Sequence, residues 1–235
     1  MHFLANRDRS ALLRRYRGRN AEKYEAKRQG PMWAAEAQAF QRLFDWVQPA
    51  SVLDCPLGTG RWIGLYQKRG ASVVGLDLSG EMLTEAARKV SEGADVRFSI
   101  GDLLQPGDNP ALRRCYDLVV CTRFLHWLRQ DEILGLLGRF QSTGSRFLII
   151  SAFVGPNNSV EGLRLPKHGW ARWKRLLIAP WRRHAPRYIH KEHDLLRTAQ
   201  NAGWKLVEKC PVMGHYYYYL LVTAAQPFEV LMEGR

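Results

Sequence analysis

The stretch VLDCPLGTGR, residues 52–61, points to the fold class. It begins as an apolar run, closes that run with the carboxylate of Asp54, and then turns into a loop that contains Gly58 and Gly60. An apolar run of this kind is typical of a strand buried in a parallel sheet. A glycine loop that leads from such a strand into a helix brings backbone N–H groups close to a ligand. We therefore expect a strand, a ligand-binding loop and a helix in this order.

Apolar strands and amphipathic helices alternate through the following hundred residues. The expected strands are 51–55, 72–78, 96–100, 116–121 and 146–154, and the expected helices between them are 61–69, 81–90 and 131–140. A helix at 192–202 and strands at 205–210 and 214–224 complete the pattern. Strands that alternate with helices and are apolar along most of their length predict an α/β fold, a doubly wound parallel sheet with helices on both faces.

The length of 235 residues predicts one domain with appendages. We assign the core to residues 49–154 and 191–235. Residues 155–190 interrupt the alternation with several glycines and prolines, which indicates an insertion. Helical periodicity appears before the core at 12–28 and 33–47.

The net charge of +13 is concentrated in two segments. Residues 1–30 carry nine Lys/Arg and three Asp/Glu, residues 161–190 carry eight and one, and the rest of the chain carries 18 of each sign. The excess therefore belongs to particular surfaces, which suit an acidic small molecule, RNA or an anionic membrane surface.

The cysteines and the hydropathy indicate a cytoplasmic protein. The four cysteines are scattered without a CxxC pair, as is typical of reduced thiols. No apolar run reaches the roughly 18 to 20 residues of a membrane span, and the N-terminus lacks the apolar stretch of a secretion signal. We expect no integral membrane segment, and at most peripheral contact with the inner face of a membrane.

The glycine loop differs from two common nucleotide loops. A Walker phosphate loop requires a lysine after its second glycine, whereas Arg61 follows Gly60 here. In a GxGxxG dinucleotide loop the third glycine comes three residues after the second, whereas Gly64 comes four residues after Gly60. Asp54 would also repel a pyrophosphate. A carboxylate at this position suits a ligand with a positive charge, such as the amino group of a methionine moiety.

Two further acids follow the next strands. Asp77 closes the second strand, where its carboxylate can accept hydrogen bonds from both ribose hydroxyls. Asp102 follows the third strand, where it can accept from an adenine amino group while Leu103 packs on the ring. The three acids predict a nucleoside site along one edge of the sheet.

Residues 50–152 resemble the class I S-adenosylmethionine-dependent methyltransferases. VLDCPLGTGR matches the E/DxGxGxG loop of that family, with Pro56 where glycine is commonest, and VVGLDLSGEML, IGDLLQ and YDLVVCTRFLHWL match its later motifs. The resemblance implies a mostly parallel seven-stranded sheet whose last strand is antiparallel, S-adenosylmethionine as cofactor, and no metal. The cofactor-binding residues that it implies are Asp54, Pro56, Gly58, Thr59, Gly60, Asp77, Leu78, Met82, Asp102, Leu103 and Thr122.

The residues after the fourth strand exclude two acceptor classes. Methylases of exocyclic amines in nucleic acids carry D/NPPY there, whereas this chain has Cys-Thr-Arg-Phe at 121–124. C5-pyrimidine chemistry requires a nucleophilic cysteine in a Pro-Cys context, which is absent. His126 is the candidate general base for a hydroxyl acceptor, with structural packing as the alternative. Arg123 is the candidate for an acidic substrate or the cofactor carboxylate, with a surface salt bridge as the alternative.

The appendages supply the remaining candidates. Residues 1–48 resemble the helical lid of small-molecule methyltransferases, in which Tyr24 is a catalytic candidate and Arg28 its i, i+4 neighbour, although a solvated basic helix fits equally. Residues 155–190 combine tryptophans with basic residues and serve as a substrate lid or surface-binding element. The substrate-contact candidates are Arg28, Trp33, Trp127, Trp170 and Trp173.

Our hypothesis is a methyltransferase that acts at oxygen on a small or lipid-linked acidic acceptor. An RNA methyltransferase that uses the basic segments is the second hypothesis. A non-catalytic binding protein that keeps the cofactor fold is the third.

Overall fold

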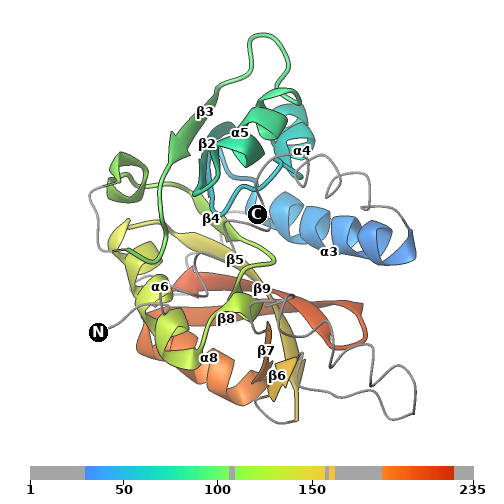
Figure 1. Cartoon of the computed structure of the whole chain (residues 1–235), viewed down its shortest axis with the longest axis vertical. Coiled ribbons are helices and arrows are strands. Elements are labelled where there is room, and N and C mark those ends of the chain that lie inside the picture. The colour runs from blue at the N-terminus through green and yellow to red at the C-terminus, as the bar shows by residue number, and fades with distance from the viewer. Residues whose placement is uncertain (1–29, 106–108, 157–158, 162–186, 225–235) are drawn as a thin grey trace, which may run out of the picture.

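Figure 1 shows the computed structural model, which describes residues 30–105, 109–156, 159–161 and 187–224. Its main sheet has seven strands in the spatial order β3-β2-β1-β4-β5-β9-β8. These strands are β1 (Ser51–Asp54), β2 (Ser72–Asp77), β3 (Val96–Ile100), β4 (Leu118–Cys121), β5 (Phe147–Gly155), β8 (Trp204–Met213) and β9 (Tyr216–Thr223).

Strand direction agrees with the expected fold class. The first five strands run parallel, and β9 runs antiparallel to both of its neighbours, β5 and β8. The doubly wound, mostly parallel seven-stranded sheet with an antiparallel last strand is therefore confirmed. All five helices expected within the described residues are present, as α3 (Pro31–Val47), α4 (Ile63–Lys68), α5 (Gly80–Ala87), α6 (Gln130–Ser142) and α8 (Glu192–Asn201).

Strand β4 shows why helices cover both faces of the sheet. Its four residues are all buried, and they alternate between two cores. Leu118 and Val120 pack in one core with the apolar stripe of α3, and Val119 and Cys121 pack in the other core with α6 and α8. In Figure 1, α3 and α6 accordingly lie on opposite sides of the sheet. A continuous apolar strand requires this double cover, because each side chain direction needs its own core.

A small ribbon extends β5 at its carboxyl end. Strands β6 (Ser159–Glu161) and β7 (Arg187–Lys191) pair antiparallel, and β7 also pairs parallel with the last residues of β5. This ribbon flanks residues 162–186. Tyr24, Arg28, Trp170 and Trp173 lie outside the described residues, as does the expected helix at 12–28.

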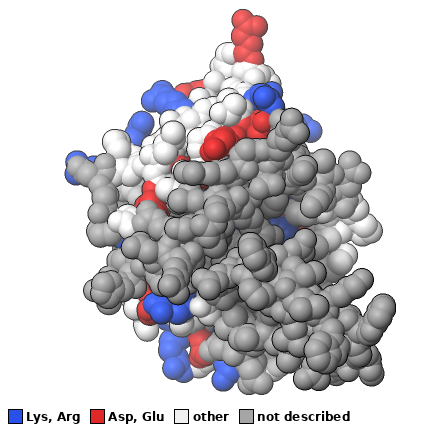
Figure 2. All heavy atoms as spheres, in the orientation of Figure 1, with Lys and Arg blue, Asp and Glu red and all other residues white. Residues whose placement is uncertain are grey.

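Charges of both signs are interspersed over the described atoms visible in Figure 2. This distribution agrees with the equal numbers of acids and bases outside the two basic segments.

Among the described helices, none combines the length and the apolar character that a membrane span requires.

Candidate functional site

The strand order reverses between β1 and β4, and the candidate site lies at this point. Strand β1 pairs with β2 on one side and with β4 on the other, so that chain segments leave the two carboxyl ends in opposite directions. Ligands of open parallel sheets bind in the crevice that such a reversal creates. Strand β1 ends at Asp54 and β2 ends at Asp77, so both carboxylates predicted to bind the ligand lie at this edge of the sheet.

The glycine loop is fastened to Asp77 across the ends of β1 and β2. The amide of Gly58 donates to Asp77 Oδ2 over 2.8 Å, and the amide of Ser79 donates to Oδ1 over 2.9 Å. Each carboxylate oxygen keeps further lone-pair capacity beyond one such bond. The predicted role of Asp77 toward ribose hydroxyls is compatible with this remaining acceptor capacity and stays a prediction.

The two loop glycines have different neighbours. Both have positive φ, +59° at Gly58 and +67° at Gly60. A Cβ at Gly58 would meet nothing within 4 Å, whereas a Cβ at Gly60 would lie 2.4 Å from Ile63 Cδ1 and 2.9 Å from Ala86 Cβ. Gly60 therefore allows α5 to pack on the loop. Gly58 leaves open space beside its backbone, which the close approach of a ligand to the loop requires.

Burial shapes the acid–base properties of the loop. Burial raises the pKa of Asp77, although the backbone N–H groups of Ser79 and Gly58 oppose the shift. Asp54 is 2% exposed and accepts a hydrogen bond of 3.0 Å from the Tyr66 hydroxyl. Burial and the neighbouring Asp54 charge raise the pKa of Tyr66 well above its ordinary value, so the phenol remains a donor. Asp54 thus lies directly before the loop as a hydrogen-bond acceptor, and its contact with a ligand amino group stays a prediction.

Burial disfavours the thiolate form of two cysteines in this region. Cys55 and Cys121 are buried at the ends of adjacent strands, and burial raises the pKa of both. Because the thiolate is the nucleophile, such thiols are inert.

The segment after β3 forms the other end of the predicted nucleoside site. Asp102 Oδ1 accepts from the amide of Leu104 over 2.8 Å, and Leu103 is buried. Arg139, on α6, donates to the carbonyl of Leu103 over 2.9 Å and to the carbonyls of Leu104 and Gln105. One guanidinium therefore holds the loop that carries both adenine candidates.

Two more cofactor candidates belong to the segment after β2. Ser79 caps α5 by accepting from the amide of Met82, and Met82 is buried under this cap. Leu78 is half-buried. Leu78 is thus more accessible than Met82, and the contact of both residues with the cofactor stays a prediction.

The segment after β4 carries Thr122, Arg123, His126 and Trp127. The indole of Trp62 donates to Thr122 Oγ1 over 3.4 Å, which ties the end of the glycine loop to the end of β4. His126 is 8% exposed, and its ring centroid lies 4.8 Å from that of Trp127. His126 is thus packed, and its catalytic role remains a prediction.

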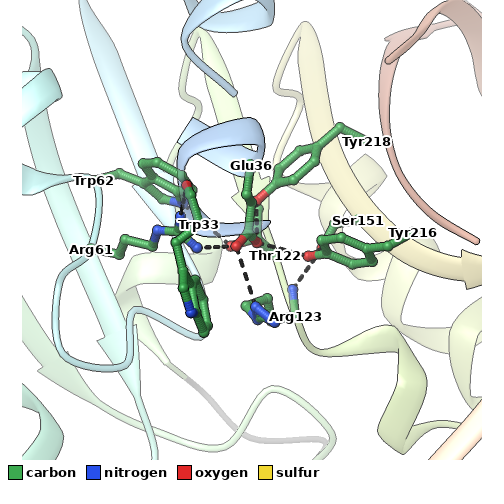
Figure 3. A network of polar contacts seen from close by, with 9 residues as sticks. All are labelled: Trp33, Glu36, Arg61, Trp62, Thr122, Arg123, Ser151, Tyr216 and Tyr218. Atoms are coloured by element: carbon green, nitrogen blue, oxygen red, sulfur yellow. Dashed lines mark hydrogen bonds and ion pairs between the residues drawn. The ribbon is translucent and has the colours of Figure 1, made fainter. Parts of the chain in front are cut away.

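A buried network around Glu36 was not predicted from the sequence (Figure 3). Glu36 is fully buried on α3. Its Oε1 accepts from the hydroxyls of Tyr216 and Tyr218, each over 2.9 Å. Its Oε2 accepts from Arg61 and, over 3.2 Å, from Arg123. One carboxylate therefore connects α3, the glycine loop, the segment after β4 and β9.

Aromatic rings surround the two guanidinium groups of this network. Arg61 lies over the rings of Trp33 and Trp62, 4.7 Å and 4.4 Å from their centroids, and Arg123 lies 4.2 Å from the Trp33 centroid. Arg61 also donates to the Trp33 carbonyl over 2.9 Å. Trp33, expected as a substrate contact, therefore lies beside both arginines, and Arg123 makes a largely buried ion pair.

The sequence does contain one signal for this network. Glu36 precedes Phe40, Leu43, Phe44 and Val47 at helical spacing, so it lies on the apolar stripe of α3. A single acid on such a stripe must be buried, and a buried charge requires partners. The partners themselves come from segments up to 182 residues away and cannot be identified from this spacing.

Residues 52–143 match the family model described as "Methyltransferase domain". This segment is a methyltransferase domain, and its fold is that of the class I S-adenosylmethionine-dependent enzymes. The matched segment runs from β1 to the end of α6, and it includes all of the cofactor-binding candidates.

One curated protein resembles a longer part of the chain than the family model does. The chloroplastic magnesium protoporphyrin IX methyltransferase of Arabidopsis thaliana is 28% identical over 180 residues, covering 74% of this chain and 52% of that protein. The chain thus spans about half the length of this curated relative.

Two solved structures share the fold. Magnesium protoporphyrin IX methyltransferase (ChlM) from Synechocystis PCC 6803 with bound SAM has a TM-score of 0.68 and 20% identity, covering 94% of this chain and 100% of that one. The DhpI–SAH complex has a TM-score of 0.65 and 22% identity, covering 92% and 97%.

Proposed function

We propose that this chain transfers the methyl group of S-adenosylmethionine to an oxygen atom of an acidic acceptor, small or lipid-linked. The observation that carries the cofactor part is the contact between the Gly58 amide and Asp77 at the reversal of strand order, within the segment that matches the methyltransferase family. It places a glycine with open space next to a carboxylate suited to ribose hydroxyls.

The chemistry divides between cofactor and chain. Bound S-adenosylmethionine supplies an electrophilic methyl group, whose bond to sulfur breaks as its bond to the acceptor oxygen forms. The chain binds and aligns the two reactants, which is the main requirement of an in-line displacement. His126 and Trp127 follow β4, the neighbour of β1, and they are the residues we assign to the acceptor side.

A carboxylate-bearing acceptor is supported by the similarity to magnesium protoporphyrin IX methyltransferase. It is also supported by the positive charge of the segments at 1–30 and 161–190, which favours an anionic acceptor. A porphyrin dicarboxylate is therefore our first candidate substrate.

The protonation state of the acceptor decides what His126 must do. A carboxylate near pH 7 has already lost its proton and needs no base, whereas a hydroxyl must give its proton to one. We therefore propose that His126 packs against Trp127 during carboxylate methylation, and that it acts as base only if the acceptor is a hydroxyl.

A radiolabelled methyl-transfer assay tests the proposal. The chain would be incubated with methyl-labelled S-adenosylmethionine and, separately, magnesium protoporphyrin IX, a simple phenol and total RNA. Label in an alkali-labile methyl ester of the porphyrin is the expected result, with similar rates for wild type and His126→Ala. Label in the phenol that requires His126 would move the acceptor to a hydroxyl compound.

The same assay separates the other two hypotheses. Label in RNA, with RNA binding that weakens steeply with salt, would support the RNA methyltransferase instead. Calorimetry with S-adenosylhomocysteine tests the third, because a chain that binds no cofactor is a binding protein rather than a methyltransferase.

A further inference from the structure

The two arginines bound to Glu36 lie where the amino-acid end of the cofactor is expected. Arg61 directly follows Gly60 in the loop after β1, and Arg123 follows Thr122 after β4. Strands β1 and β4 are neighbours at the reversal of strand order. The two guanidinium groups therefore lie at the same edge of the sheet as Asp54, the predicted partner of the ligand amino group.

Both guanidinium groups are held in fixed orientations. Arg61 is bound by Glu36 on one side and by the Trp33 carbonyl on another, and it stacks on the rings of Trp33 and Trp62. Arg123 has the left-handed φ of +56°, and its amide donates to Ser151 Oγ over 2.7 Å. Because a guanidinium is planar, its orientation decides which N–H groups face a ligand.

Glu36 is itself fixed from the far side. The hydroxyls of Tyr216 and Tyr218 donate to its Oε1, and the hydroxyl oxygen of Tyr216 also lies 2.7 Å from Ser151 Oγ. Burial, followed by the charge of Glu36, raises the pKa of Tyr216, so its hydroxyl keeps its proton and remains a donor. Strand β9 therefore fixes the position of the Glu36 carboxylate, and that carboxylate fixes the orientation of the Arg61 and Arg123 guanidinium groups.

We propose that Glu36 is a positioning residue that orients Arg61 and Arg123 toward the carboxylate at the amino-acid end of the cofactor. The domain thereby distinguishes adenosyl ligands that carry this carboxylate from those that lack it. Guanidinium groups bind carboxylates through charge-assisted hydrogen bonds, and Asp54 supplies the complementary charge for the amino group. This inference rests on the cofactor assignment of the proposed function.

Two ligands separate this role from a general structural one. S-adenosylhomocysteine has the amino-acid end, and 5′-methylthioadenosine lacks it. In Glu36→Gln, calorimetry should show the affinity for S-adenosylhomocysteine weakened roughly tenfold or more, as expected for a lost charge-assisted contact, with the affinity for methylthioadenosine changed less than about twofold.

Asp45→Asn is the matched control. Asp45 lies on the same helix and makes an ion pair of 2.7 Å with Arg69, both partly exposed. The substitution makes the same change of charge away from the arginines of the site, so both affinities should equal those of wild type. A loss of S-adenosylhomocysteine binding in this control would overturn the inference, because the charge of the helix rather than Glu36 would then be responsible.

Arg61→Lys keeps the proposal testable if Glu36→Gln does not fold. Lysine retains the charge but lacks the planar fork, so the preference for S-adenosylhomocysteine over methylthioadenosine should fall in this variant too. An unchanged preference in the folded variants, or an equal loss of affinity for both ligands, would overturn this inference but leave the cofactor assignment intact. A wild-type chain that binds neither ligand would overturn the cofactor assignment, and the inference with it.

Discussion

Replacing Gly60 with alanine tests whether the glycine loop owes its shape to packing against α5. The new Cβ would lie 2.9 Å from the Cβ of Ala86 and 2.4 Å from Cδ1 of Ile63. The end of the isoleucine side chain can rotate away, but the Cβ of Ala86 is fixed to the helix backbone. Either the loop or α5 must therefore move.

The magnitude has two parts. A non-glycine residue at the φ of +67° costs about 1–2 kcal/mol, and overpacking a well-packed site costs about 1–3 kcal/mol. We expect Gly60→Ala to lower the free energy of unfolding by roughly 2–5 kcal/mol. Gly58→Ala is the matched control, because Gly58 has a similar φ of +59° and no atom within 4 Å of the added Cβ. Gly58→Ala should lower the free energy of unfolding only by the conformational part, about 1–2 kcal/mol.

Equilibrium urea unfolding, followed by circular dichroism, measures both variants. The difference between them isolates the packing contribution, provided that the dependence on urea is the same in both. Adding Ala86→Gly to the Gly60→Ala chain should recover part of the lost stability, since it removes the fixed atom of the clash. Equal losses in the two glycine variants would refute the reasoning, because the contact with α5 would then carry no cost.

Three further predictions concern the cofactor site and the segment beside His126. Asp77→Asn should weaken S-adenosylhomocysteine binding by roughly 1–3 kcal/mol in calorimetry, since charge-assisted hydrogen bonds to ribose are lost; unchanged binding would remove Asp77 from the ribose site. Arg139→Gln should weaken S-adenosylhomocysteine and methylthioadenosine equally, because Arg139 holds the loop at the adenine end; a selective effect on one ligand would contradict this assignment. The third prediction concerns His190, whose pKa is lowered by burial although its hydrogen bond to the Leu125 carbonyl opposes the shift. The unfolded chain then binds more protons at this group, so wild-type stability should fall as the pH drops below about 6.5. His190→Gln should show a shallower fall in thermal unfolding experiments, and an identical pH profile would disprove the role of this group.

The expected strands and helices within the described residues were predictable because they depend on local patterns. The apolar run in β4 predicts burial on both faces, and the structure contains a separate core on each side of it. The glycine spacing and the strand-end acids likewise depend on short segments, so the loop, Asp54 and Asp77 could be placed at one sheet edge before the structure was known.

The tertiary structure alone decided which side chains meet at that edge. Glu36 was visible as an acid on an apolar helix face, yet its partners Tyr216 and Tyr218 come from the far end of the chain. The hold of Arg139 on the Leu103 carbonyl likewise joins segments 36 residues apart. Sequence periodicity specifies which face of an element is buried, because that depends on near neighbours. It does not specify which buried polar groups pair, because that depends on how distant elements pack.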